Sequence, residues 1–146
     1  MDKCTSINET SRKYPPISVR TRECTKSYKV PGTNLTLKKA SAVFVPVLGI
    51  QSEPEYHAEP DKFDPKRFSP ENNAKRHSAA CIPFGDGSCA CIGLRFGIMQ
   101  TKFGLTTLLK YFRVTTYQKT KVPLQVNPQN FILSVREGVW LEAERI

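Results

Sequence analysis

The most constraining feature of the sequence is a proline-free stretch from residue 91 to residue 111, in which apolar side chains recur at helical spacing. Ile92, Phe96, Met99 and Phe103 lie at i, i+4, i+7 and i+11, so they share one face of a helix. Other apolar residues widen that face: Leu94, Ile98, Leu105, Leu108, Leu109 and Phe112. A helix that is apolar over so much of its surface is typical of the interior of a large protein. We therefore predict a long helix over residues 91–111 that needs other parts of a fold to cover it.

Length and composition limit what this chain can build. Its 146 residues suffice for one compact domain, but a hydrophobic share of 39% is low for a well-closed core. Eleven prolines and eight glycines interrupt the chain often, which favours short elements joined by ordered loops. We expect either such a domain or a piece of a larger core.

The net charge of +9 comes from basic residues spread along the chain, with Lys75, Arg76 and His77 as the densest cluster. A positive surplus is compatible with nucleic-acid binding, yet no zinc-finger or helix-turn-helix spacing and no aromatic stacking pattern accompanies it. A basic surface is the simplest interpretation, and docking of an acidic redox partner is another. We predict no nucleic-acid partner.

The cysteines argue for a reducing compartment. Five of them at irregular spacing do not make a secreted disulfide framework. These are Cys4, Cys24, Cys81, Cys89 and Cys91. The first ten residues lack the apolar core of a signal peptide, and no apolar run approaches the ~20 residues of a membrane span. We expect a chain that is soluble or at most peripheral to a membrane, with at least one thiol kept for chemistry.

Short elements are predicted before the long helix. Residues 2–13 are predicted to be helical and to end before Pro15 and Pro16. Residues 27–30 and 35–38 flank a proline–glycine turn signal as two short strands, and residues 42–47 form a third strand.

The segment from residue 51 to residue 70 holds four prolines, which remove too many backbone donors for regular structure. We predict an ordered meander there, pinned by Tyr56, Phe63 and Phe68. After the long helix we predict short strands over residues 112–117, 131–135 and 139–142.

The segment from Phe84 to Gly93 has the residues that a thiolate ligand to a haem iron requires. At the head of the long helix, Cys91 would meet the positive end of the helix dipole and free backbone N–H groups, which stabilise a thiolate. Gly87 and Gly93 allow the chain to pass close beneath a flat macrocycle. The ring of Phe84 can pack beside the sulfur and shield it.

Other interpretations of single residues are simpler. A Cys89-x-Cys91 pair is a weak metal motif, but no second Cys or His pair lies nearby in the sequence. We interpret His57 and His77 as loop residues rather than ligands.

This segment resembles the signature of the cytochrome P450 family, Phe-x-x-Gly-x-x-x-Cys-x-Gly, with all four positions filled by Phe84, Gly87, Cys91 and Gly93. The resemblance implies that Cys91 is the axial ligand to iron, and that the cofactor is haem b, which is iron protoporphyrin IX. It also implies that Phe84, Gly87 and Gly93 contact that cofactor.

Two further motifs occur in the order that the family has them. Glu9 and Arg12 match a Glu-x-x-Arg helix motif, and Arg67 lies in a matching Pro-x-Arg-Phe element. The resemblance implies that these three form a buried ionic triad that locks the core on the side of the cysteine loop, which is the segment from Phe84 to Gly93. Taken alone, Glu9 and Arg12 would be an ordinary i, i+3 surface pair and Arg67 a surface arginine.

The chain departs from the family pattern before the cysteine. Many members have Pro-Arg-Asn where this chain has Ser88, Cys89 and Ala90, and that arginine usually pairs with a haem propionate. Arg22 matches the family's other propionate-binding arginine. Ser11 also replaces a residue that is commonly leucine.

The resemblance runs over residues 1–146 and implies a mixed α and β fold, the C-terminal part of the cytochrome P450 fold, with its N-terminal two-thirds absent. The expected elements are a short helix, small β-sheets, a meander, the cysteine loop, a long buried helix and a terminal β-hairpin. The sequence is most like insect microsomal members that metabolise xenobiotics.

The implied activity is that of a monooxygenase. Such an enzyme oxidises a small apolar substrate with O2 and with electrons from an NADPH-dependent reductase, at the cytosolic face of the endoplasmic reticulum membrane. Membrane association would come through a missing N-terminal segment or through peripheral contact. We expect the isolated 146-residue chain to be inactive, and the alternative is a non-catalytic remnant that binds haem weakly or not at all.

Overall fold

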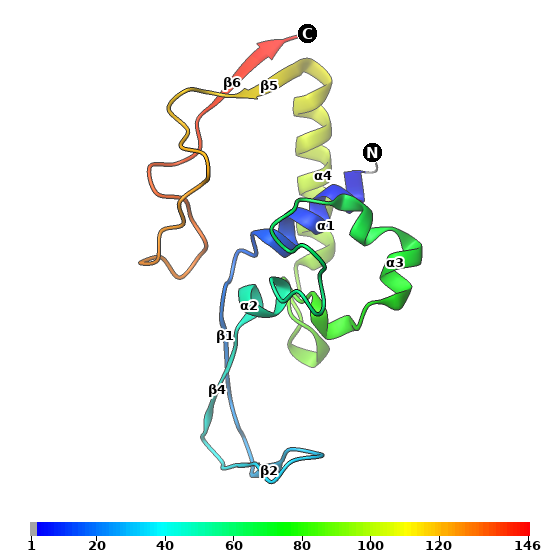
Figure 1. The fold of residues 1–146 in the computed structure, drawn as a ribbon, viewed down its shortest axis with the longest axis vertical. Coiled ribbons are helices and arrows are strands. Elements are labelled where there is room, and N and C mark those ends of the chain that lie inside the picture. The colour runs from blue at the N-terminus through cyan, green and yellow to red at the C-terminus, as the bar shows by residue number, and fades with distance from the viewer. Residues whose placement is uncertain (1–2) are drawn as a thin grey trace.

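The computed structural model describes residues 3–146 and has the mixed α and β architecture that the sequence predicts (Figure 1). Asp2, the first residue of the predicted N-terminal helix, lies outside the described residues. The elements, in chain order, are α1 (Lys3–Lys13), β1 (Arg20–Glu23), β2 (Tyr28–Lys29), β3 (Thr36–Leu37), β4 (Ala42–Val45), α2 (Val47–Gln51), η1 (Pro65–Phe68), α3 (Pro70–Lys75), η2 (Ser78–Ala80), η3 (Gly87–Cys89), α4 (Leu94–Tyr111), β5 (Phe112–Thr116) and β6 (Leu141–Arg145).

The strands form three separate antiparallel pairs, β1 with β4, β2 with β3, and β5 with β6. The pair β2–β3 closes around the predicted turn, where Gly32 has a φ of +74° and the Val30 amide donates to the Leu35 carbonyl over 2.9 Å. Such a positive φ favours glycine because a side chain would collide with the backbone.

Strand β1 is not predicted from the sequence. Its sequence, Arg-Thr-Arg-Glu, shows no apolar alternation, and the strand exists because its backbone pairs with β4 in the register Arg20↔Val45 to Glu23↔Ala42. The predicted strand over residues 131–135 is wrong, because only isolated bridges join Ile132 to Ile17 and Val135 to Val126. A local pattern cannot reveal pairing with a distant partner.

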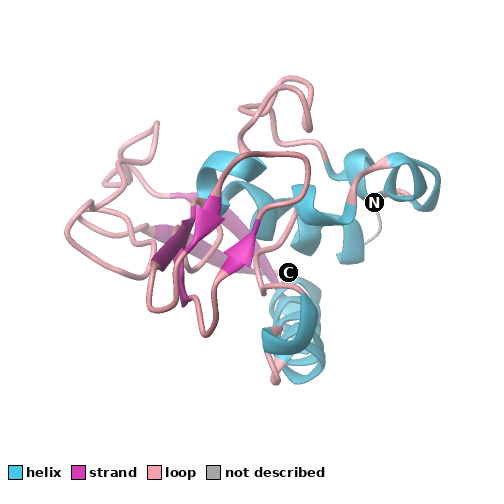
Figure 2. Ribbon diagram, turned by 90° about the horizontal axis from the view of Figure 1, so that it is seen from below, coloured by secondary structure: helices cyan, strands magenta, loops and turns pink. Residues whose placement is uncertain are grey.

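The long helix is shorter and far more exposed than predicted. It begins at Leu94 rather than at Cys91, and α1 packs across its middle (Figure 1). None of its residues is buried, and the exposed fractions of Phe96 and Phe103 are 65% and 76%. Figure 2, which looks along α4 from one end, shows the strands and the other helices on one side of it. The helix is therefore not buried as predicted, because α1 alone does not cover its apolar face.

The core lies between α1, α2 and η1 and is small. Its buried apolar residues are Ile7, Val47, Phe68 and Ala80. Charged and polar side chains share that interior, including Glu9 and Arg12 with no exposed area. Stability at this point depends on polar contacts as much as on apolar packing.

The proline-rich segment is mostly irregular, as predicted, with short turns of helix starting at Pro65 and Pro70. Asp64 and Ser69 cap these turns by accepting from the backbone amides of Lys66 and Asn72. Of the three aromatic residues predicted to pin the meander, only Phe68 is buried. Tyr56 and Phe63 lie at the surface, so the two are not pins.

Candidate functional site

A buried ion pair joins Glu9 and Arg12 on consecutive turns of α1. The Nε and Nη2 atoms of Arg12 donate to the two carboxylate oxygens of Glu9 over 2.8 and 2.9 Å. The Nε atom of Arg67, from η1, lies 3.5 Å from Oε1 of the same carboxylate, and the Asp64 amide donates to that oxygen over 3.0 Å. The structure thus brings together the three charged residues that the sequence motifs single out.

Arg12 also binds the loops around α1. Its Nη1 atom donates to the carbonyl of Gln51 over 2.8 Å and its Nη2 atom to the carbonyl of Pro60 over 2.7 Å. Because a planar guanidinium offers five donors in a fixed arrangement, one side chain can hold the helix, α2 and the meander together.

Gln51, which no sequence pattern predicts as part of the site, extends this network to Ile82, two residues before the cysteine loop. Its side-chain Nε2 donates to the Arg12 carbonyl over 2.8 Å, and its Oε1 accepts from the Ile82 amide over 2.9 Å. Gln51 has no exposed area. No motif marks this residue, and an isolated polar residue after the apolar run of α2 is the only signal that could have singled it out.

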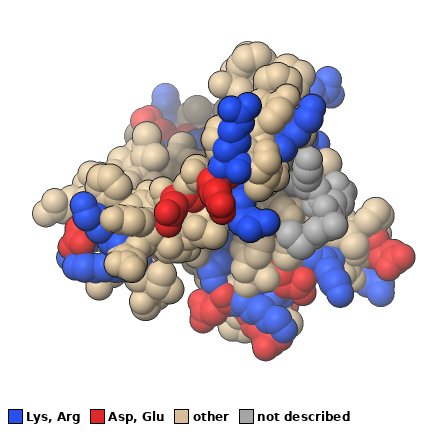
Figure 3. Space-filling view, turned by 90° about the horizontal axis from the view of Figure 1, so that it is seen from above, with Lys and Arg blue, Asp and Glu red and all other residues tan. Residues whose placement is uncertain are grey.

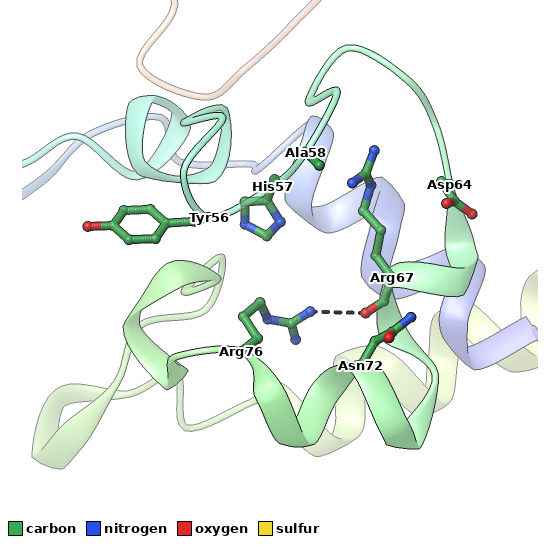
Figure 4. A pocket seen from close by; sticks show the side chains of 7 residues that line it. All are labelled: Tyr56, His57, Ala58, Asp64, Arg67, Asn72 and Arg76. Carbon is green, nitrogen blue, oxygen red and sulfur yellow. Dashed lines mark hydrogen bonds between the residues drawn. The ribbon is translucent and has the colours of Figure 1, made fainter.

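A polar cavity of about 260 Å³ lies on the outer side of the network (Figure 4). Arg76 points into it, lies over the ring of Phe68 at 4.4 Å from the centroid, and donates from Nη1 to the Arg67 carbonyl over 3.3 Å. The ring of His57, buried beside it, has its Nε2 atom 2.9 Å from the Ala80 carbonyl. Burial lowers the pKa of His57, and the positive charges of Arg12, Arg76 and Arg67 lower it further.

The cysteine loop is a series of tight turns. Gly85 and Gly87 have φ values of +82° and +71°. The Asp86 carboxylate accepts from the Gly87 amide over 2.8 Å, and the Cys91 amide donates to the Phe84 carbonyl over 2.8 Å. These bonds hold the Phe84 and Cys91 ends of the loop together.

Cys91 is exposed and lies just before α4 rather than within it. Gly93 is the residue that precedes the helix, and the Leu94 amide donates to the Cys91 carbonyl over 3.2 Å. A Cβ added to Gly87 or Gly93 would meet no atom within 4 Å, so there is open space beside the backbone at both glycines. Phe84 is half-buried, and it lines an apolar pocket together with residues of α1 and α4 such as Ile7 and Leu105.

Two arginines of β1 differ in where they lie. Arg20 reaches the cysteine loop, where its Nη2 atom donates to the Pro83 carbonyl over 2.8 Å. Its Nε atom is buried without a hydrogen-bond partner. Arg22, the arginine that the sequence analysis singled out, is exposed, and its Nη1 atom donates to the Thr21 carbonyl over 2.8 Å.

Charge on the molecular surface is dispersed. On the face shown in Figure 3, Lys and Arg side chains alternate with acidic and uncharged ones rather than forming one continuous patch. Among residues 3–146, no cluster of three His, Cys, Asp or Glu side chains is placed to hold a metal ion. No helix in the same part of the chain is long and apolar enough to span a membrane.

Most of the chain matches one known protein family. The family model described as Cytochrome P450 matches residues 4–141. The chain belongs to the cytochrome P450 family. Its fold is accordingly the C-terminal part of the P450 fold.

Insect P450 proteins are close relatives. The chain is 43% identical to "Probable cytochrome P450 6a14" of Drosophila melanogaster over 140 residues, which is 96% of this chain. It is 40% identical to cytochrome P450 6k1 of Blattella germanica over 91% of its length, and 41% identical to cytochrome P450 6A1 of Musca domestica over 96%. The chain spans 28%, 25% and 28% of the length of these relatives, respectively.

The P450 family implies a haem, and the described residues fit one. Cys91 presents an accessible thiol between two open glycine positions. The buried Nε atom of Arg20 lacks an acceptor, and the guanidinium of Arg22 is exposed, so the β1 side of the loop offers cations to an anionic ligand. Exposed apolar residues such as Ile92 and Phe96 continue the surface onto α4.

Proposed function

We propose that this chain is the haem-thiolate portion of a monooxygenase, with Cys91 as the axial ligand of the iron in haem b. The observation that carries the proposal is the exposed Cys91 at the end of a glycine turn, in a segment that Gln51 links at Ile82 to the helix of the buried ion pair. A mobile loop could not hold one sulfur at a fixed point below a macrocycle, and the network supplies the necessary rigidity.

The haem, when bound, would supply the oxygen activation, and a thiolate ligand favours that chemistry by donating electron density. The protein would supply the position and the surroundings of the sulfur. Phe84 would shield one side, and Gly87 and Gly93 would let the backbone approach the ring closely.

Glu9, Arg12 and Arg67 would act as positioning residues. They lie in the interior, and their link to the loop runs through Gln51, which accepts from the Ile82 amide over 2.9 Å. A shift of α1 would therefore be transmitted to the segment before Phe84.

The further properties proposed for the whole protein follow the family. Its substrates are small apolar molecules, O2 is the oxidant, and the electrons come from an NADPH-dependent reductase. The net charge of +9 would suit an acidic reductase surface. We propose the cytosolic face of the endoplasmic reticulum membrane as its location.

Cys89 supports an alternative, a non-catalytic chain that holds haem weakly. A thiol cannot replace the charge-assisted contact of the arginine that many members have at this position. The Soret band of the reduced, carbon monoxide-bound chain separates the two proposals, because a thiolate-type band supports ligation by Cys91 and its absence favours the non-catalytic chain.

The test of haem ligation is spectroscopic. The chain is reconstituted with haem, reduced and exposed to carbon monoxide, and the Soret band is recorded for the unaltered chain, for Cys91→Ser and for Cys89→Ser. We expect a red-shifted thiolate-type band that Cys91→Ser abolishes and Cys89→Ser retains. Cys89 is the matched control because it is an exposed cysteine two residues away. An identical band in all three would refute the proposed ligand.

A further inference from the structure

Arg20 is held unusually close to the cysteine loop. Its Nη1 atom would lie 2.7 Å from a Cβ atom added to Gly85, a distance that real Cβ contacts do not show. Its Nη2 atom donates to the Pro83 carbonyl over 2.8 Å, across 63 positions in the sequence. The guanidinium therefore rests directly against the backbone on either side of Phe84.

The present partners of Arg20 leave it incompletely satisfied. The Nε–H group is buried and has no acceptor, and one carbonyl does not neutralise a guanidinium. Within residues 3–146, no carboxylate lies within salt-bridge distance of this side chain. A buried, unpaired donor on a charged group is costly, which is why such groups are normally paired with an anion.

The strand adds a second cation on the same side. Arg20 and Arg22 are two residues apart on β1, so their side chains leave the same face of the strand. Their cross-strand partners are Val45 and Val43, so no acidic side chain opposes either arginine in the pairing. Two guanidiniums on one face suit a ligand that carries two carboxylates.

We propose that Arg20 pairs with a propionate carboxylate of the haem, and so restores the cation that is lost where Cys89 stands in place of the family's arginine. This inference rests on the proposed function. Arg22 remains the partner of the other propionate. The pairing would give the Arg20 guanidinium the charged acceptor that it lacks in the protein alone.

The experiment varies both the residue and the ligand. Equilibrium affinity of the chain is measured by absorbance for iron protoporphyrin IX and for its dimethyl ester, which lacks both carboxylates. The variants are Arg20→Gln, which keeps a donor for the Pro83 carbonyl but removes the charge, and Arg20→Lys, which keeps the charge. Arg145→Gln, in β6 at the far end of the molecule, is the control for loss of one positive charge (Figure 1).

We expect Arg20→Gln to weaken binding of the free acid by on the order of tenfold, as loss of a charged hydrogen bond would, and to leave binding of the ester unchanged. Arg20→Lys should retain most of the preference for the free acid, and Arg145→Gln should change neither affinity.

An equal loss for both ligands would overturn the proposal, because it would show that Arg20 only braces the loop. No loss for either ligand would overturn it as well. The Soret band separates this failure from failure of the proposed function, since a thiolate band that depends on Cys91 leaves the ligand assignment intact. Absence of any haem binding would overturn both.

Discussion

Arg12 and Glu9 form a two-point ion pair within one helix, with N–O distances of 2.8 and 2.9 Å and no exposed area on either residue. Burying both charges of such a pair and removing only one of them have unequal effects on the free energy of unfolding. Taking both charges out of water costs free energy, but leaving one buried charge without its partner costs more.

Arg12→Met should therefore lower the free energy of unfolding by about 3–5 kcal/mol, because it leaves the Glu9 carboxylate buried with weaker partners. Urea denaturation followed by circular dichroism measures this loss. Lys121→Met is the matched control, since Lys121 and Glu137 form a 2.8 Å pair whose side chains are about 60% exposed. That surface pair should contribute only about 0–1 kcal/mol. Equal losses in the two variants would contradict a structural role for the buried pair.

Gln51→Leu should loosen the segment before the cysteine loop. It leaves the Ile82 amide and the Arg12 carbonyl without their partners, at about 1–3 kcal/mol for each buried group. Hydrogen exchange should then become faster at the Ile82 amide. Gln125→Leu, at an exposed position, should leave that exchange rate unchanged. Unaltered protection of Ile82 in Gln51→Leu would show that the network does not reach the loop.

The stability of the protein should fall in mild acid because of His57. Burial holds the pKa of His57 below its usual value of 6.5. In mild acid the unfolded chain therefore binds a proton at His57 more readily than the folded chain does. The contribution of neutral His57 to the free energy of unfolding is complete above about pH 6.5. It is lost as the pH falls towards the lower pKa that His57 has in the folded state.

Urea midpoints at pH 7.5 and 5.5 measure this pH dependence. His57→Gln keeps a donor for the Ala80 carbonyl and should reduce the difference between the two midpoints. Gln118→Asn, at an exposed residue without a titratable group, should preserve it. A difference that is the same in all three proteins would assign the acid sensitivity to other groups.

Cysteine reactivity should follow burial. Burial raises the pKa of the Cys81 thiol to about 11, so this thiol is almost entirely protonated at pH 8. Cys89 and Cys91 are exposed. Iodoacetamide at pH 8, followed by mass spectrometry, should label Cys89 and Cys91 well before Cys81. In urea the three should react at similar rates, which controls for local sequence effects. Early labelling of Cys81 in the folded chain would contradict its placement.

The sequence located several features because they are local. An i, i+3 spacing placed Glu9 and Arg12 on one side of α1, and the proline–glycine turn set the pairing of β2 with β3. The long helix was predicted from apolar spacing, but its first residue was misplaced by three positions. The periodicity of apolar residues does not show at which residue a turn ends and a helix begins, as happens here after Gly93.

Other features could not be predicted from local patterns. Strand β1 has a charged sequence, and its strand character comes from pairing with β4, whose residues lie 19 to 25 positions away from their partners. The prediction that Tyr56 and Phe63 hold the meander in place is wrong, because both are exposed. Hydrogen bonds from Arg12 and Arg67 hold that segment instead.

The sequence by itself determined the family, the turn glycines and the identity of the cysteine that stands among them. Only the tertiary structure decided that Gln51 connects Arg12 to the cysteine loop and that Arg20 lies against Gly85. The hydrogen bonds from Ile82 to Gln51 and from Arg20 to Pro83 join residues 31 and 63 positions apart. Their formation depends on how whole elements pack, and the spacing of residues along the sequence does not reveal that packing.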